Sequence, residues 1–498
     1  MLDACRYEGI RSVRLRMTNS MSLTPDFLET CRGQKILIIE PFYWTPHVET
    51  GLELAEILSE QNDVTYVGPD VLRSATEGTA RLASRMQYAL SRKRSVSRYV
   101  TPNARAYSRG EIASIEHGMD LPNPRTFLDP TSPDLEHLKF KEFDVGMGII
   151  SSLISLTRDV HFDRGRYSDL AIALGRDAMK LYLLTQELVR ANGCDMVILF
   201  NGRVAAARGI RRACEAMSIR YIVHERGSSR DKYALFDRST PHLPEGIRRW
   251  ADDWWRISAD PEANARAFLA KRRQNVATGW YSFTGNQRAG HYPPRDGRKR
   301  VTFFTSSDDE MIAIGDELPP DSTYCDQVNA LRLIGQACRD RDYEFIVRFH
   351  PNTPPTQHTL RSAAREVSPL VVEPSSPVDT YALIDSSDVV FTQNSTVGIE
   401  AAAVGKPAFY AGRNLFEGCH SVLRIMNDGD VSAAIETTDP PADPIDALRY
   451  ANYFGEHGIR YRYFEPRGFL SGTYRGRDLN APFSALRDLR LRLTRGAT

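Results

Sequence analysis

Short apolar runs alternate with stretches of helical periodicity in two parts of the chain. An apolar run followed by an amphipathic helix and another apolar run is how a parallel α/β domain begins. The first series of expected strands and helices is 35–40, 49–60, 63–68, 170–191, 196–200, about 205–217 and 220–223. We therefore expect a Rossmann-like domain over residues 34–240.

A second series of the same kind starts near residue 300. Its expected strands and helices are 301–305, 328–340, 344–349, 377–386, 388–392, 397–404 and 407–410. This pattern predicts a second Rossmann-like domain over residues 298–440. The first domain lacks the GxGxxG fingerprint after its first strand, so a dinucleotide is not the expected ligand.

The remaining segments have weaker patterns. We expect a flexible leader at 1–33, an insertion at about 72–166 in the first domain, an interdomain segment at 241–297, and C-terminal helices at 441–498 that pack back on the domains.

Composition and charge narrow the class of protein. The 498 residues are 42% hydrophobic, and 64 Lys plus Arg balance 63 Asp plus Glu, so the net charge is +1. That balance argues against a nucleic-acid partner. Seven scattered cysteines without a CxxC pair favour reduced thiols in a cytosolic protein, with neither a zinc ribbon nor a disulfide framework. Basic stretches at 92–94 and 486–495 leave peripheral contact with the inner face of a membrane open, although such runs are more often solvated.

Polar side chains follow three expected strands of the second domain. Parallel strands present their carboxyl ends at one edge of a sheet, where ligands bind, and hydroxyls and an imidazole suit a phosphate there. Each loop alone also fits ordinary helix capping. The candidate phosphate-binding residues are Ser306, Ser307, His350, Pro351, Asn394, Ser395 and Thr396. Glu400 is expected either to hold a nucleoside hydroxyl or to complement the start of its helix.

In the first domain, Glu225 follows the strand at 220–223 and is the carboxylate best placed to act on a sugar. It can serve as a base or as a nucleophile, and the alternative is a salt bridge to a neighbouring arginine. Asp231 is the reserve catalytic candidate.

Other polar residues at the same edge are candidates for binding a sugar or an acceptor. An arginine can grip a sugar carboxylate with two hydrogen bonds, although a surface arginine after a glycine turn is nearly as common. These candidates are Asn201, Arg203, Arg226 and His47.

Taken together, these motifs resemble bacterial capsule and surface-polysaccharide glycosyltransferases of the β-Kdo transferase type, and more distantly bacterial sialyltransferases. The matching segments are 200–203, 224–227, 305–310, 350–351 and 394–401. The resemblance implies a GT-B fold, α/β, in which two Rossmann-like parallel domains face a central cleft, the first taking the acceptor and the second the nucleotide sugar.

The same resemblance implies the chemistry. The donor is CMP-Kdo or a related CMP-sugar, and His350, Ser395 and Thr396 hold its phosphate. CMP leaves as a monophosphate, so no metal or other cofactor is expected. The acceptor is an oligosaccharide or a lipid-linked glycan. The chain departs from the sialyltransferase pattern, which has two acids before a glycine, because Glu225-Arg226-Gly227 has one.

Two other functions fit the same pattern. One is a GT-B transferase that uses a UDP-sugar, a GDP-sugar or CDP-glycerol, with Arg348 or Arg413 serving the diphosphate. The other is a non-catalytic glycan-binding protein that assists export.

Overall fold

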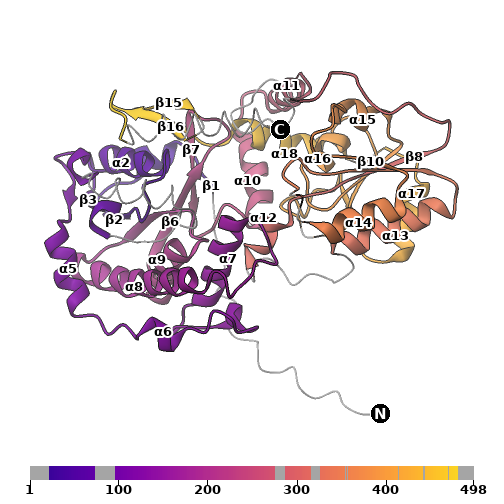
Figure 1. The fold of residues 1–498 in the computed structure, drawn as a ribbon. Helices are drawn as coiled ribbons and strands as arrows, with labels where there is room; N and C mark the ends of the chain where they lie inside the picture. Colours follow the sequence, from indigo (N-terminus) through magenta and orange to yellow (C-terminus); the bar gives the residue numbers. More distant parts are fainter. Residues whose placement is uncertain are drawn as a thin grey trace, which may run out of the picture.

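The computed structural model describes residues 22–72, 96–274, 286–315 and 326–479, except for 354, 356, 413, 441, 442 and 469. The chain forms two α/β lobes that are joined by helices at their junction (Figure 1). No helix of these described ranges is both long and apolar enough to span a membrane.

The first lobe is built on an eight-stranded sheet. Its path is β1-β7-β6-β5-β2-β3-β4, with β14 paired to β7. The bounds are β1 Ser22–Leu23, β2 Lys35–Ile39, β3 Asp63–Val67, β4 Arg105–Ala106, β5 Met196–Phe200, β6 Arg220–Arg226, β7 Lys232–Asp237 and β14 Ile459–Arg460. Neighbours from β6 to β4 pair in parallel, whereas β7 is antiparallel to β6, β1 and β14. The order reverses between β2 and β5, which is where a doubly wound sheet opens a ligand crevice.

The second lobe is a six-stranded sheet whose strands are all parallel, in the order β10-β9-β8-β11-β12-β13. The bounds are β8 Arg300–Phe304, β9 Glu344–Arg348, β10 Leu370–Val372, β11 Val389–Thr392, β12 Ala408–Tyr410 and β13 Leu423–Arg424. Counted from β8, this is the Rossmann order 3-2-1-4-5-6. The expected fold of two Rossmann-like α/β domains is confirmed.

Helices cover both faces of each sheet because their apolar residues recur at helical spacing. The larger ones are α2 His47–Leu58, α5 Arg109–His117, α7 Val145–Thr157, α8 Ser168–Asn192, α9 Ala205–Ala216, α13 Gln327–Arg339, α14 His358–Val367, α15 Thr380–Ser386, α16 Val397–Ala402 and α17 Asp428–Glu436. In the region expected as an insertion, α7 is mostly buried and packs against α8 and α9.

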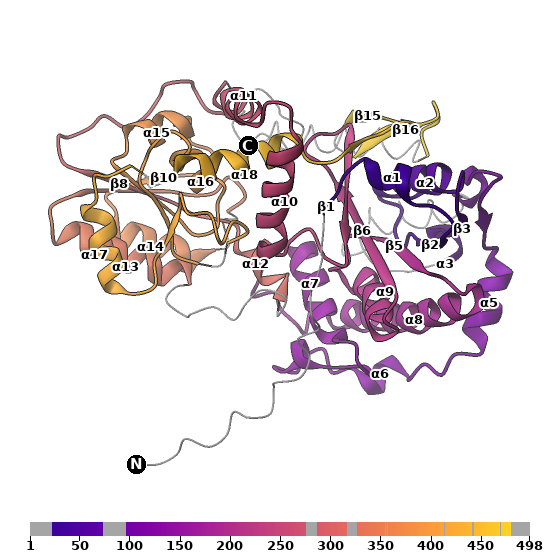
Figure 2. The same ribbon diagram turned by 180° about the vertical axis from the view of Figure 1, so that it is seen from behind.

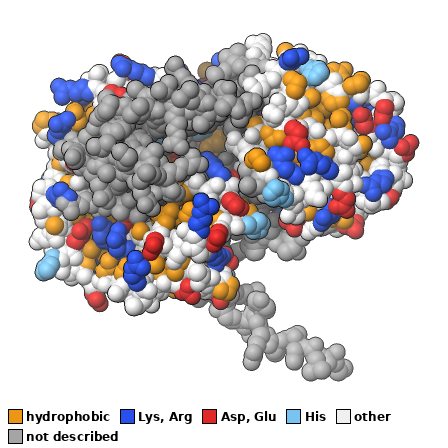
Figure 3. All heavy atoms as spheres, in the orientation of Figure 1, with side chains coloured by type: hydrophobic (Ala, Val, Ile, Leu, Met, Phe, Trp, Pro, Cys, Tyr) orange, Lys and Arg blue, Asp and Glu red, His pale blue; other side chains and the backbone are white. Residues whose placement is uncertain are grey.

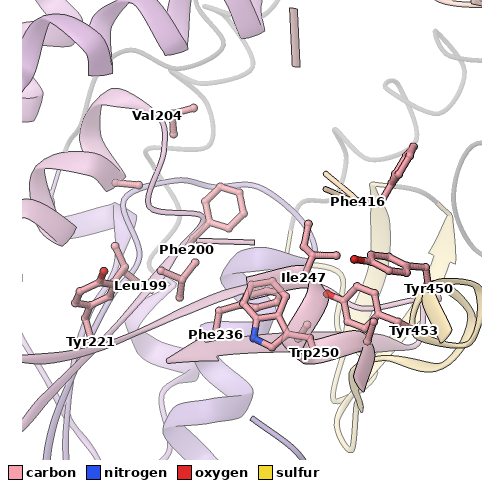
Figure 4. Packing of buried hydrophobic residues seen from close by; sticks show 14 of the residues in the cluster. Leu199, Phe200, Val204, Tyr221, Phe236, Ile247, Trp250, Phe416, Tyr450 and Tyr453 are labelled. Carbon is pink, nitrogen blue, oxygen red and sulfur yellow. The ribbon is translucent and has the colours of Figure 1, made fainter. Parts of the chain in front are cut away.

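Three helices join the lobes: α10 Pro244–Ile257, α11 Pro261–Arg273 and α18 Pro444–Glu456 (Figure 2). One hydrophobic cluster continues from the first sheet through Phe236 and Trp250 to Phe416, Tyr450 and Tyr453 (Figure 4). The lobes are therefore packed on one another through shared apolar side chains.

Two terminal segments differ from expectation. Residues 22–30 of the expected leader are folded, because β1 pairs with β7 and α1, Asp26–Thr30, buries Phe27 and Leu28. In place of helices alone, the C-terminal segment supplies α18, β14 and a hairpin, β15 Phe464–Gly468 and β16 Ser471–Tyr474, which lies on the first lobe. The basic stretches at 92–94 and 486–495 lie outside the described residues.

Candidate active site

Three loops meet at the carboxyl edge of the second sheet. The backbone N–H of His350, after β9, donates to Thr305 Oγ1 at 2.8 Å, and the N–H of Asn394, after β11, donates to Ser306 Oγ at 2.9 Å. Thr305 and Ser306 are buried directly after β8. The structure thus brings together the three loops expected to share this edge. The Ser306 hydroxyl links the loop after β8 to the loop after β11.

The His350 ring has a defined donor side. The N–H of Asn352, past Pro351, donates to His350 Nδ1 at 3.2 Å, which places the proton of the neutral ring on Nε2. Burial lowers the pKa of His350 to about 4, against the opposing charge of Asp309. At neutral pH the imidazole is therefore an uncharged hydrogen-bond donor rather than a cation.

Two further hydroxyls lie just before α16. Ser395 is half-buried and its Oγ accepts the N–H of Val397 at 3.3 Å, while Thr396 is exposed. Ser307 is engaged elsewhere, because its hydroxyl donates to Asp309 at the start of α12, Asp308–Ile312.

Glu400 forms a buried ion-pair network. Its carboxylate accepts hydrogen bonds from Tyr381 at 2.6 Å and Thr396 at 3.2 Å, and it lies 2.9 Å from Arg272 Nη2. The charge of Glu400 raises the pKa of Arg272. These bonds fix α16 to α11 and α15, an arrangement that neither sequence interpretation of Glu400 included.

In the first lobe, Glu225 lies near the end of β6 with its carboxylate held from several sides. Asn201 Nδ2 donates to Oε2 at 2.9 Å, the backbone N–H of Arg226 donates to Oε1 at 3.0 Å, and His47 Nε2 lies 3.6 Å from Oε1. The side chain remains 21% exposed. Glu225 is thus oriented by the protein and still accessible, as a reacting carboxylate must be.

His47 is the first residue of α2 and packs on the ring of Phe200 with a centroid distance of 3.9 Å. Burial and then the charges of Arg226 and His224 lower its pKa well below the usual range. A neutral imidazole beside Glu225 can donate a hydrogen bond without neutralising the carboxylate.

Sequence reasoning missed a buried pair behind Glu225. Glu40 Oε1, after β2, is hydrogen-bonded to His224 Nε2 on β6, and both residues are at most 1% exposed. Burial raises the pKa of Glu40. The available signal was an acidic residue ending an apolar strand at the point where the strand order reverses.

The two remaining predicted residues differ in their bonding. Asp231 accepts hydrogen bonds from Ser229 and from Arg460 of β14, and its side chain is 42% exposed. Arg203 joins the Glu225 arrangement, because its backbone N–H donates to Asn201 Oδ1 at 3.2 Å, and its Nη1 donates to Ser151 of α7 at 3.2 Å. The partners that surround Glu225 are therefore not shared with Asp231.

Helix α7 borders both clusters. Ser151 contacts Arg203 on the first-lobe side, while Arg158, just after the helix, pairs with Asp309 of the second lobe at 2.9 Å. Charged and histidine side chains gather along the junction of the two lobes (Figure 3). Both strand-end clusters therefore lie next to the junction.

The fold is GT-B-like. No family model matches the chain, and no curated protein matches it either. Among solved structures, the β-Kdo 2,4-transferase of Thermosulfurimonas dismutans KpsC aligns at 13% identity and a TM-score of 0.36, covering 52% of this chain and 79% of that one. The KpsC β-Kdo 2,7-transferase of the same organism aligns at 14% identity and a TM-score of 0.33, covering 55% and 85%.

A UDP-GlcNAc 2-epimerase from Neisseria meningitidis bound to UDP-GlcNAc aligns at 10% identity and a TM-score of 0.27, covering 84% of this chain and 96% of that one. Likenesses of this size assign no activity and no residue role to this chain.

Proposed function

We propose that this protein is a glycosyltransferase that moves Kdo or a related 2-keto sugar acid from its CMP donor to a glycan or lipid-linked acceptor. The observation that supports it most is the set of hydrogen-bonded loops after β8, β9 and β11, where polar groups converge at one sheet edge. The motif resemblance of these loops to β-Kdo transferases supplies the identity of the donor.

In this proposal the second lobe binds the CMP phosphate. Nε2–H of neutral His350 and the hydroxyl of Ser395 donate to phosphate oxygens, with Asn394 beside them. The Thr396 hydroxyl, which donates to Glu400, would have to turn from that carboxylate to reach the phosphate. Pro351 shapes the turn after His350. Hydrogen bonds to an anion are stronger than those between neutral groups. Donors that the fold already holds in place lose little entropy when the ligand binds.

Glu225 acts at the anomeric carbon of the sugar. Asn201 and the N–H of Arg226 hold its two oxygens, which limits rotation of the carboxylate. As a base it would take the proton of the acceptor hydroxyl while the acceptor oxygen displaces CMP. As a nucleophile it would displace CMP to form a glycosyl intermediate, which the acceptor hydroxyl then attacks to release the carboxylate. Arg203 and Arg226 are the candidates to bind a carboxylate of the donor or the acceptor sugar.

Calorimetric titration with CMP, CDP, UDP and GDP tests the donor class. We expect CMP to bind, and a preference for UDP or GDP would contradict the CMP proposal. With CMP-Kdo as donor, Glu225→Gln should lose turnover while keeping its affinity for CMP. Asp231→Asn, measured in parallel, identifies which carboxylate is required. A protein that only binds glycans would show no turnover in any form.

The diphosphate alternative receives less support from the geometry. Arg348 is buried and donates to the backbone oxygen of Val378 at 2.9 Å, and burial lowers its pKa to about 10. Its guanidinium therefore lies in the interior of the lobe. Arg413, the other arginine considered for a diphosphate, lies outside the described residues.

A further inference from the structure

The C-terminal hairpin forms one wall of a recess on the first lobe. The opposite wall consists of the loop after β2, at Thr45 and Pro46, and the end of β6 with the loop that follows it. Phe464 and Pro466 of β15 line the hairpin side. The empty volume is about 280 Å³ including its open mouth, and the inner part is narrow, so it suits a small group rather than a whole sugar.

The hairpin wall is anchored to the domain. The buried carboxylate of Glu53 on α2 accepts three backbone N–H groups at the start of β15, from Arg462 at 2.7 Å, Tyr463 at 3.1 Å and Phe464 at 3.3 Å. A wall held in this way is formed before a ligand arrives, which reduces the entropy lost on binding.

The charge of the recess is positive. Arg226 and Arg230 line it, and none of the described residues that line it is acidic. Arg226 Nη2 donates to the backbone oxygen of Thr45 at 3.2 Å, which orients a guanidinium that has five N–H donors in all. The side chains of Phe464 and Pro466 form an apolar wall across the recess from these arginines.

Arg226 links the recess to the candidate catalytic carboxylate. The backbone N–H of Arg226 holds Glu225 Oε1 at 3.0 Å, so the residue that lines the recess also positions Glu225. We propose that this recess is an acceptor subsite that binds an anionic group, a carboxylate or a phosphate. Binding there would place the reacting hydroxyl of the acceptor at Glu225. The inference rests on the proposed function and adds that the acceptor carries a negative charge.

Binding to the full-length, CMP-loaded protein tests the subsite. One pair of probes is the methyl glycoside of Kdo and its methyl ester, and the other is farnesyl phosphate and farnesol. We expect one charged probe to bind at least about tenfold more tightly than its neutral partner, because a hydrogen-bonded ion pair is lost in the neutral form. A response to the carboxylate alone identifies a sugar-acid acceptor, and a response to the phosphate alone identifies a lipid phosphate.

Matched variants locate the effect. Arg230→Gln should weaken the charged probe at least about tenfold and leave the neutral one unchanged. Arg467→Gln is the control, since Arg467 is an exposed arginine on the same hairpin that does not line the recess. Pro466→Glu, which adds a negative charge to the wall, should also abolish the preference for charge.

Equal binding of charged and neutral probes, or an unchanged preference in Arg230→Gln, would overturn the inference. CMP titration of the same samples separates the two proposals. Loss of CMP binding with an intact Arg230 effect would reject the donor assignment alone, and CMP binding without an Arg230 effect would reject the subsite alone.

Discussion

Asn201→Asp is the sharpest test of how the protein holds Glu225. The substitution keeps the shape of the side chain, and aspartate tolerates the left-handed backbone of this position, where φ is 59°. It replaces an amide donor 2.9 Å from Glu225 Oε2 by a carboxylate oxygen. Asn201→Gly is the matched control, because it removes the amide without adding charge and suits the same backbone.

The magnitudes of the two changes differ. Loss of a hydrogen bond to a charged group costs about 1.5–3 kcal/mol, which is roughly a 10- to 150-fold effect. Two carboxylates about 3 Å apart repel by roughly 5 kcal/mol at an effective dielectric constant of about 20. In this variant the two carboxylates would titrate as a coupled pair, and the second proton would leave at a higher pH than it does from a lone carboxylate.

Transferase turnover, measured from mildly acidic to mildly alkaline pH, distinguishes the outcomes. If Glu225 reacts as a carboxylate, Asn201→Asp should move the acid limb of the pH–rate profile upward by about one unit or more. Asn201→Gly should lower turnover and move that limb upward by less, because it removes a hydrogen bond to the carboxylate without adding a charge. Both variants should keep the CMP affinity, which our proposal assigns to the other lobe. An unshifted limb in an active Asn201→Asp enzyme would refute the role of Glu225.

Three other predictions concern the second lobe and the stability of the fold. His350→Ala should weaken CMP binding by about tenfold or more in a calorimetric titration, and His350→Gln, which retains an N–H donor, should weaken it less; equal binding by all three proteins would remove His350 from the site. Burial lowers the pKa of both His350 and His457 to about 4, whereas a histidine in the unfolded chain has a pKa of about 6.5. Below about pH 6.5 the unfolded chain therefore binds more protons than the folded one. The free energy of unfolding should therefore fall between about pH 6.5 and pH 4, by roughly 2 kcal/mol per histidine near pH 5, and urea melts of His457→Gln should show a shallower fall. Arg300 is fully buried and holds Glu344 through bonds of 2.7 and 3.1 Å, so Arg300→Met should cost about 3–5 kcal/mol in a urea melt, with much of the loss recovered by adding Glu344→Leu.

The local pattern of the sequence was sufficient for the framework of the fold. Apolar runs such as 196–200 and 389–392 are typical of strands in a buried parallel sheet, and polar residues that follow such strands lie at its carboxyl edge. For this reason the loops holding Ser306, His350 and Asn394 could be grouped from the sequence alone. The antiparallel strand β7 was missed, because a strand's neighbour and direction depend on pairing rather than on its own residues.

The partners of the site residues required the tertiary structure. Glu40 and His224 are 184 residues apart, and nothing local in either segment predicts their bond. Glu400 could not be assigned to its ion pair from sequence, because Arg272 lies on a helix that only the folding of the lobes brings to α16.

The sequence by itself thus determined the two sheets and which loops lie at their ligand-binding edges, since both follow from the period of apolar residues. The tertiary structure alone decided that Glu225 is held by Asn201 beside His47, that His350 Nδ1 accepts the N–H of Asn352, and that the C-terminal hairpin forms one wall of a recess lined by Arg226 and Arg230. Side-chain bonds of this kind join residues distant in the chain, and their geometry is fixed only when the cores of both lobes have packed.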